Sequence, residues 1–154
     1  MTLETNSKNL ADPLFSEIWK QCQHCTMTSY ERGLTLFNAI RHIALNGVVG
    51  DIVECGVWRG GSAMIAIKAM QHFNIEREIW LFDTFEGMTA PSQFDVDHEG
   101  KLADKQLQDA SEEKDSALIW ARATLEEVKN NINRTGYPER LVHYVKGKKE
   151  RSVY

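Results

Sequence analysis

The sequence predicts an α/β domain built on a parallel sheet, and three observations support this fold class. A short apolar strand, residues 51–54, ends in an acid and runs directly into a glycine-rich turn. A second apolar strand, residues 78–82, follows one helix later and ends at Asp83. Helical and strand segments alternate along the chain, and right-handed crossovers between such strands make a sheet parallel.

The N-terminal residues 1–25 predict an arm or a first helix, because one short amphipathic piece lies around residues 14–19. A capped helix follows, in which Thr28 supplies the N-cap hydroxyl and Glu31 supplies the carboxylate three residues later. Asn46-Gly47 ends this helix. Its apolar face consists of Leu34, Phe37, Ile40, Ile43 and Ala44.

Residues 26–154 are predicted as one domain that contains the remaining elements. The helix from Ser62 to about His72 is apolar nearly all round, which predicts burial against the sheet. The continuous apolar run at residues 79–82 is typical of a parallel strand covered on both faces. A third helix is expected from about 115 to 131 and a third strand at 141–145. The helix stripe comprises Leu118, Ala121, Leu125, Val128 and Ile132.

The segment between the second strand and the third helix is long and acidic. It predicts a solvated surface loop. The alternative is a lid over the substrate, because long loops at the carboxyl ends of strands often serve function.

Composition excludes several classes of protein. The 154 residues suffice for one domain with a core, and 42% hydrophobic and 26% charged residues are ordinary for a globular protein. The net charge of −4, without a long basic run, predicts no nucleic-acid partner. No apolar stretch approaches the ~20 residues that span a bilayer, so no membrane association is expected. A polar N-terminus argues against secretion and predicts a cytoplasmic protein.

The three cysteines do not form a disulfide framework. Cys22 and Cys25 have metal-type spacing, but no second Cys or His pair matches it, so no metal site is expected. Cys55 lies in the glycine-rich turn and is expected to be a small buried residue.

The turn at residues 55–62 predicts a nucleoside site, because glycines let the backbone approach a ligand and the next helix offers free N–H groups. Dinucleotide folds require G-x-G-x-x-G, whereas Trp58 occupies the place of the second glycine. Glu54 before the turn suits an ammonium group, and Asp83 after the second strand suits ribose hydroxyls. S-adenosylmethionine carries both groups. The alternative is a turn whose glycines only allow tight packing.

Specific strings extend this interpretation to a family. Glu-Cys-Gly-Val-Trp-Arg-Gly-Gly-Ser lies within residues 51–62, and Phe-Asp-Thr-Phe-Glu-Gly lies within residues 81–88. Thr-Met-Thr-Ser and Glu-Arg within residues 26–32, and Tyr-Val-Lys-Gly at 144–147, complete the pattern. From about residue 26 to its end, the chain closely resembles the macrocin O-methyltransferase (TylF-like) family of S-adenosylmethionine-dependent enzymes.

This resemblance implies a Rossmann-like, three-layer methyltransferase fold with a parallel sheet, and methyl transfer to a hydroxyl of a small molecule, such as a sugar on a natural product. It also implies a set of cofactor-binding residues. Glu54, Gly56 and Ser62 line the methionine end of the cofactor. Asp83 holds the ribose, with Thr84 and Phe85 beside the adenosine. Thr26 and Met27 close over the cofactor from the N-terminal side.

The chain also departs from the family. Family members continue into a fourth strand with an acidic cluster that binds Mg²⁺ and holds the catalytic base, whereas this sequence ends at Tyr154 without such a cluster. We therefore expect the N-terminal part of a methyltransferase, with about three of the usual strands, no catalytic or metal residue assigned, and no activity of its own.

Two alternatives remain open at this point. One is a non-catalytic remnant that binds a cofactor or a partner. The other is a nicotinamide-dependent oxidoreductase, which Trp58 disfavours. The expected partner is a small hydroxylated acceptor. A homo-oligomer is also open, because the first strand would have a bare edge.

Overall fold

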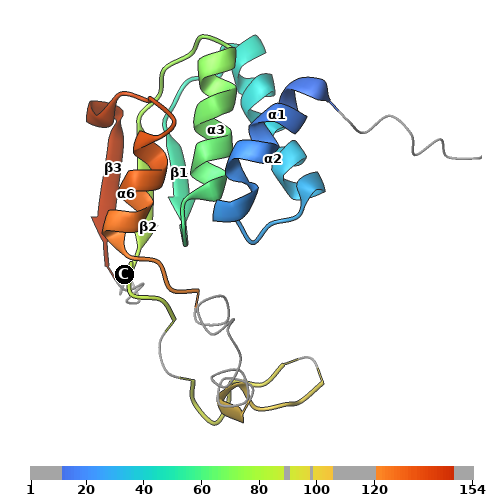
Figure 1. The fold of residues 1–154 in the computed structure, drawn as a ribbon, viewed down its shortest axis with the longest axis vertical. Coiled ribbons are helices and arrows are strands. Elements are labelled where there is room, and N and C mark those ends of the chain that lie inside the picture. Colours follow the sequence, from blue (N-terminus) through green and yellow to red (C-terminus); the bar gives the residue numbers. More distant parts are fainter. Residues whose placement is uncertain (1–11, 89–90, 98, 106–120, 148–154) are drawn as a thin grey trace, which may run out of the picture.

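A computed structural model describes residues 12–88, 91–97, 99–105 and 121–147 (Figure 1). Their sheet has three parallel strands in the order β1-β2-β3. The strands are β1 (Ile52–Cys55), β2 (Ile79–Asp83) and β3 (Val142–Lys146). Each lies within one residue of its predicted position. The predicted α/β class with a parallel sheet is confirmed.

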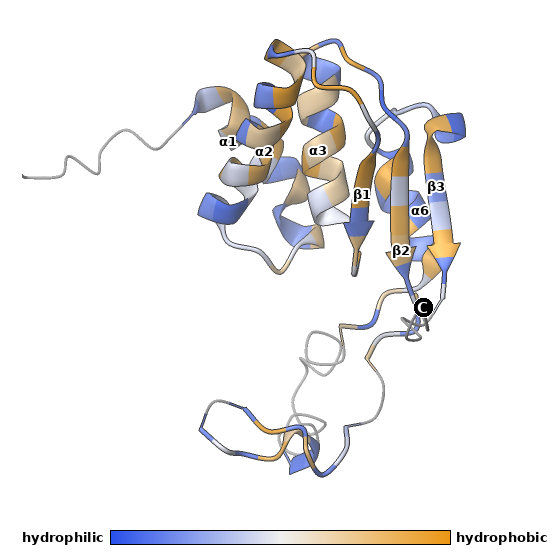
Figure 2. Ribbon diagram, turned by 180° about the vertical axis from the view of Figure 1, so that it is seen from behind, coloured by the Kyte–Doolittle hydropathy of each residue, from blue (hydrophilic) through white to orange (hydrophobic). Residues whose placement is uncertain are grey.

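Helices supply the rest of the described fold. They are α1 (Pro13–Cys22), the 3₁₀ turn η2 (Gln23–Cys25), α2 (Tyr30–Leu45), α3 (Gly61–His72), α6 (Leu125–Asn133) and the 3₁₀ turn η3 (Glu139–Leu141). Seen from behind, β2 and β3 lie in front of α6 (Figure 2). Helix α3 packs against α6, so the described helices α3 and α6 cover the same face of the sheet.

The core lies between that face and the helices. Ile65 and Met70 of α3 and Ile79 and Leu81 of β2 are fully buried, as expected for a helix that is apolar nearly all round. Phe15 of α1 is also fully buried, and it packs against Phe37 of α2 with ring centroids 5.6 Å apart. The N-terminal helix thus belongs to the same hydrophobic core.

The opposite face of the sheet corrects the expectation that β2 is covered on both sides. Phe82 is 38% exposed and Val53 of β1 is 59% exposed. On this face Trp80 stacks on His143, with ring centroids 4.0 Å apart. The prediction was wrong because α3 and α6 bury only one face, and no helix in the described ranges covers the other.

The start of α2 also differs from its prediction. The N-cap is Ser29, whose hydroxyl accepts a hydrogen bond from the Arg32 N–H at 3.4 Å. Thr28 instead donates its backbone N–H to the Thr26 hydroxyl at 3.1 Å. The helix therefore begins one residue later than expected, and Arg32 occupies the third helical position in place of Glu31.

The third predicted helix is much shorter than expected. It begins at Leu125, after the N-cap Thr124, whose hydroxyl accepts a hydrogen bond from the Glu127 N–H at 3.2 Å. Ala121 has φ +44°, a left-handed conformation in which an α-helix cannot continue. The apolar stripe thus overestimated the length of the helix, and Leu118 lies outside the described residues.

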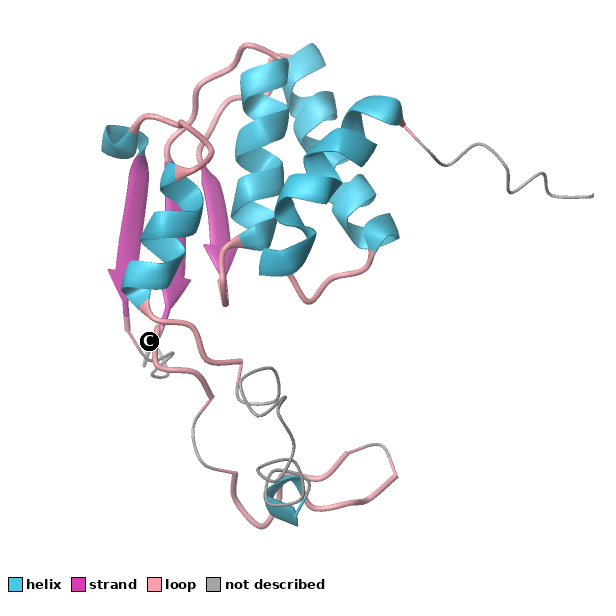
Figure 3. Ribbon diagram, in the orientation of Figure 1, coloured by secondary structure: helices cyan, strands magenta, loops and turns pink. Residues whose placement is uncertain are grey.

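Parts of the long acidic segment are described. Val96 and Leu102 form an isolated antiparallel bridge, and both side chains are about half exposed. The yellow segment of Figure 1, which contains both residues, lies beyond the arrowheads of the strands, and Figure 3 marks these strands in the same view. The loop and lid interpretations both extend into residues outside the described ranges. Within those ranges, no helix combines the length and apolarity that a membrane crossing requires.

Candidate functional site

The carboxyl ends of the parallel strands carry the charged residues of the candidate site. Glu54 lies near the end of β1 and Asp83 ends β2. The turn from β1 to α3 begins at Gly56, which has φ +88° and donates its N–H to the Phe82 carbonyl at 2.9 Å. Ligands of open α/β sheets bind at this end, so the fold places the turn where a ligand is expected.

Asp83 fixes the conformation of this turn. Its Oδ2 accepts hydrogen bonds from the N–H groups of Val57 at 2.6 Å and Trp58 at 3.2 Å. Its Oδ1 accepts one from the Phe85 N–H at 2.8 Å. Trp58 has φ +49°, a left-handed conformation that is costly for a bulky residue. The carboxylate therefore helps to hold the Trp58 backbone in a conformation usually adopted by glycine.

A pocket of about 280 Å³ lies between this turn and the segment that links η2 to α2. We call residues 25–28 the N-terminal strap. The pocket is lined by Cys25, Thr26, Met27, Thr28, Arg32, Glu54, Gly56, Val57, Trp58, Gly61 and Ser62. It thus joins residues that lie about thirty positions apart in the sequence.

A close contact places the strap over the start of α3. A Cβ atom on Gly61 would come within 2.5 Å of the Cys25 carbonyl group and 2.6 Å of the Thr26 Cβ. Real Cβ contacts are never that short, so only glycine lets the strap lie here. Gly61 therefore determines how near Thr26 comes to the turn.

Glu54 is the most perturbed acid of the pocket. Burial raises the pKa of its carboxyl to about 7, and the nearby Asp83 charge adds to this, although hydrogen bonds from the Ala63 backbone and the Ser62 side chain oppose it. One oxygen, Oε2, is buried without a hydrogen-bond partner. A buried carboxylate oxygen without a partner is costly, and a cationic hydrogen-bond donor in the pocket would satisfy it.

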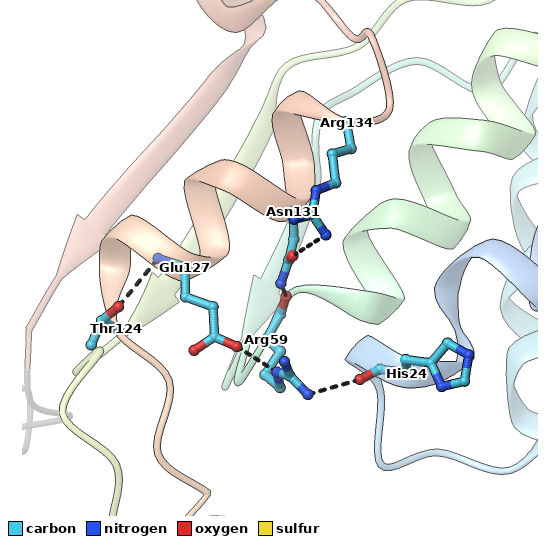
Figure 4. Close-up of polar contacts among 6 residues, drawn as sticks. All are labelled: His24, Arg59, Thr124, Glu127, Asn131 and Arg134. Atoms are coloured by element: carbon cyan, nitrogen blue, oxygen red, sulfur yellow. Dashed lines mark hydrogen bonds and ion pairs between the residues drawn. The ribbon is translucent and has the colours of Figure 1, made fainter.

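Arg59 links the turn to two other elements (Figure 4). Its Nε lies 2.5 Å from Glu127 Oε1 on α6, and its Nη1 donates to the His24 carbonyl of η2 at 3.0 Å. Its own carbonyl accepts a hydrogen bond from the Asn131 side chain of α6 at 2.9 Å. We call these three contacts the Arg59 clip. The clip joins the turn, α6 and the residue next to the strap.

The structure brings together five of the eight residues that the sequence predicts for the cofactor. Thr26, Met27, Glu54, Gly56 and Ser62 all line the pocket. Asp83, Thr84 and Phe85 do not line it. Asp83 contacts the turn, the Thr84 hydroxyl donates to the Gly87 carbonyl at 3.1 Å, and Phe85 is buried with φ +54°.

Other residues of the pocket were not predicted. Cys25, Arg32 and Trp58 line it, although the sequence interpretation gave Arg32 no role and used Trp58 only to exclude a dinucleotide. The sequence signal for Arg32 was its position in the first turn of α2. This position was not recognised, because the N-cap was predicted one residue too early. The expectation that Cys55 is buried was wrong, because Cys55 is exposed on the same uncovered face of β1 as Val53. In the described part of the chain, no three His, Cys, Asp or Glu side chains cluster as metal ligands would.

Comparisons with known proteins agree on one family. The model of the macrocin-O-methyltransferase (TylF) family matches residues 16–152. A tetracenomycin glycoside 4'-O-methyltransferase of Streptomyces olivaceus is 31% identical over 139 residues, which cover 89% of this chain and 49% of that protein. Mycinamicin III 3''-O-methyltransferase of Micromonospora griseorubida is 31% identical over 123 residues, which cover 79% of this chain and 45% of that protein.

Two further matches are also O-methyltransferases by name. Demethyldecarbamoylnovobiocin O-methyltransferase of Streptomyces niveus is 27% identical, with 84% of this chain and 45% of that protein covered. The solved structure of the O-methyltransferase NovP is similar with a TM-score of 0.56 and 25% identity, over 78% of this chain and 46% of that chain. The fold is therefore the Rossmann-like fold of an O-methyltransferase, and the chain spans about half the length of the curated relatives it matches.

Proposed function

The chain belongs to the macrocin-O-methyltransferase (TylF) family, and from this membership we propose that it serves S-adenosylmethionine-dependent methyl transfer to a hydroxyl oxygen. The acceptor in this proposal is a small glycosylated natural product. The names of three relatives support it, because each is an O-methyltransferase of a tetracenomycin, novobiocin or mycinamicin compound.

One observation carries the proposal for the cofactor. Glu54 lines a pocket between the glycine-rich turn and the N-terminal strap, and its Oε2 is buried without a hydrogen-bond partner. An ammonium group satisfies such an oxygen, whereas a pyrophosphate would meet a second negative charge. The residues present therefore fit the amino acid end of S-adenosylmethionine.

In this proposal Glu54 binds the ammonium group, and Gly56 and Ser62 lie along the methionine end. Thr26 and Met27 cover the cofactor from the N-terminal side. Asp83 serves the ribose, and Thr84 and Phe85 lie on the adenosine side. The bound cofactor supplies an electrophilic methyl group on its sulfonium. The chain's own residues orient that group and shield it from water.

No residue of this chain is assigned to deprotonate the acceptor. Mg²⁺ is an expectation from the family resemblance, and the described residues contain no cluster of three His, Cys, Asp or Glu side chains that could hold it. We expect residues 1–154 alone to bind the cofactor without methyl transfer. The chain spans about half of relatives that carry the activity.

Calorimetric titration of the chain with S-adenosylhomocysteine and with NAD⁺ tests the proposal. We expect S-adenosylhomocysteine to bind and NAD⁺ to bind at least about tenfold more weakly, because Trp58 hinders a pyrophosphate at the turn. Tighter binding of NAD⁺ would replace the proposal with a nicotinamide-dependent oxidoreductase. Methyl transfer to a glycoside by residues 1–154 would contradict only the expected lack of activity.

A further inference from the structure

Arg32 is the one arginine among the residues that line the pocket, and the proposed function leaves it without a role. It lies in the first turn of α2, and its side chain is exposed. Its backbone N–H donates to the Ser29 hydroxyl. Among the described residues, its guanidinium group has no ion-pair or hydrogen-bond partner. The pocket therefore contains an arginine whose charge no other described side chain balances.

The stability of α2 does not explain an arginine at this position. The N-terminus of a helix has a partial positive charge, so a cation in the first turn is unfavourable. Arg32 occupies the third helical position, where a capping box has a carboxylate. The neighbouring Glu31 is the acid of this turn, but it forms no ion pair with Arg32 in the described structure. Hydrogen bonds from its own backbone N–H and from Ser29 lower the pKa of the Glu31 carboxyl, which shows that this carboxylate is engaged in the helix cap.

The pocket thus has an arginine without a described partner and an acid with one unpartnered oxygen. Glu54 comes from β1, with its buried Oε2, and Arg32 comes from α2. An α-amino acid has an ammonium and a carboxylate on one carbon, so it needs a pair of this kind. A cation at the start of α2 also becomes favourable once a carboxylate binds it, because the helix N-terminus attracts the same anion.

We propose that Arg32 binds the α-carboxylate of the cofactor's methionine end while Glu54 binds its ammonium group. This inference rests on the proposed function, because it assigns a part of the same ligand. It makes Arg32 a specificity-determining residue. The pocket distinguishes complete S-adenosyl amino acids from thioadenosines that lack the carboxylate.

Three ligands separate the contributions of the two charges. S-adenosylhomocysteine has both the ammonium and the carboxylate, 5'-(3-aminopropylthio)-5'-deoxyadenosine has the ammonium alone, and 5'-methylthioadenosine has neither. Calorimetric titrations of the wild-type chain should give roughly 10- to 100-fold tighter binding of the first ligand than of the second, the range for a charge-assisted hydrogen bond. Equal affinities for these two ligands would overturn the inference without any variant.

Variants then identify the residue. Arg32→Gln should weaken the binding of S-adenosylhomocysteine by roughly 10- to 100-fold. It should change the affinities for the two smaller ligands by no more than about twofold. Arg32→Lys should recover part of the loss, because it keeps the charge without the bidentate geometry. Glu54→Gln should weaken the binding of both ligands that have an ammonium group. Arg41→Gln, an exposed position on α2 away from the pocket, is the matched control and should change nothing.

The outcomes separate this inference from the proposed function. If the wild-type chain binds S-adenosylhomocysteine and Arg32→Gln binds it equally well, only the inference fails. The same holds if Arg32→Gln weakens all three ligands by the same factor, which indicates a general loss of structure. If the wild-type chain does not bind S-adenosylhomocysteine, the proposed function fails and the inference fails with it.

Discussion

At the scale of single residues, the two acids at the strand ends have different environments. Glu54 is buried beside the pocket with an unpartnered oxygen, whereas Asp83 accepts three backbone N–H hydrogen bonds from Val57, Trp58 and Phe85. Strand patterns and the following turn predict where both acids lie. They do not predict the contacts of Asp83, because these depend on a left-handed Trp58 that no sequence pattern signals.

The raised pKa of Glu54 makes the stability of the unliganded protein depend on pH. The carboxyl titrates at about 7 in the folded chain against 4.5 in the unfolded chain. Its contribution is therefore fully present below about pH 4.5 and is lost as the pH rises to about 7. The loss is about 3 kcal/mol, at 1.36 kcal/mol per pKa unit. In Glu54→Gln this loss should disappear, so the variant should gain stability over the wild type at pH 8 but not at pH 4.5.

Urea unfolding at these two pH values measures the effect. Glu126→Gln, which changes an exposed acid of α6, is the control and should follow the wild type at both pH values. Parallel pH dependence in the wild type and Glu54→Gln would contradict the prediction.

Asp83 has a structural role that can be separated from cofactor binding. In Asp83→Ala, the three N–H groups lose their acceptor, and the free energy of unfolding should fall by about 1–3 kcal/mol without any ligand present. A residue that served the ribose alone would leave the unliganded protein unchanged. Urea unfolding of the unliganded variant decides between the two. Glu126→Ala is the control, since Glu126 is an exposed acid of α6 outside the turn.

At the scale of elements, the start of α6 was readable from the sequence but was placed too early. Thr124-Leu125-Glu126-Glu127 has the form of a capping box, and the Thr124 hydroxyl caps the helix in the structure. The longer apolar stripe outweighed this signal. The Arg59 clip was beyond prediction, because Arg59, Glu127 and His24 become neighbours only through the fold.

The Arg59 clip should affect cofactor affinity more than stability. Arg59 and Glu127 are 40% and 36% exposed, and ion pairs with this exposure contribute about 0–1 kcal/mol. Arg59→Met should therefore change the free energy of unfolding little. It should weaken S-adenosylhomocysteine by roughly 3- to 10-fold, because the turn and the strap lose their connection.

Arg140→Met is the matched control for this prediction. Arg140 lies in η3 and forms a more exposed ion pair with Glu76 at 3.5 Å, away from the pocket. Its loss should leave affinity unchanged. If titration shows that both variants weaken the binding of S-adenosylhomocysteine equally, the Arg59 clip does not contribute specifically to binding.

At the scale of the whole molecule, the described sheet is covered on one face and has β1 at its edge. The order of the elements and the parallel sheet follow from the sequence pattern, because strand and helix periods differ. The sequence pattern does not predict that Val53 and Phe82 are exposed. A continuous apolar run looks the same whether one face or both faces of the strand are covered.

This edge predicts self-association of residues 1–154. Val53 is 59% exposed on a strand that pairs with one neighbour in the described sheet, and open apolar edges pair with other chains. Sedimentation velocity at tens of micromolar should therefore show dimers or larger species. Val53→Lys should shift the chain towards monomer, because an edge charge opposes strand pairing.

Val96→Lys controls for a general effect of added charge. Val96 is 53% exposed but lies in the segment beyond the strand ends, so the variant should associate like the wild type. A wild-type chain that sediments as a monomer would show that the edge of β1 does not drive association.

The contact at Gly61 also has a consequence for the kinetics of ligand exchange. The Cys25 carbonyl group packs so closely on Gly61 that no side chain fits between them, and the adjacent His24 carbonyl is held by Arg59. Met27, at the other end of the strap, is 52% exposed. We therefore expect ligands to enter and leave past Met27. The residence time of a bound ligand should then depend on the size of that side chain, while the anchored end of the strap stays closed throughout the exchange.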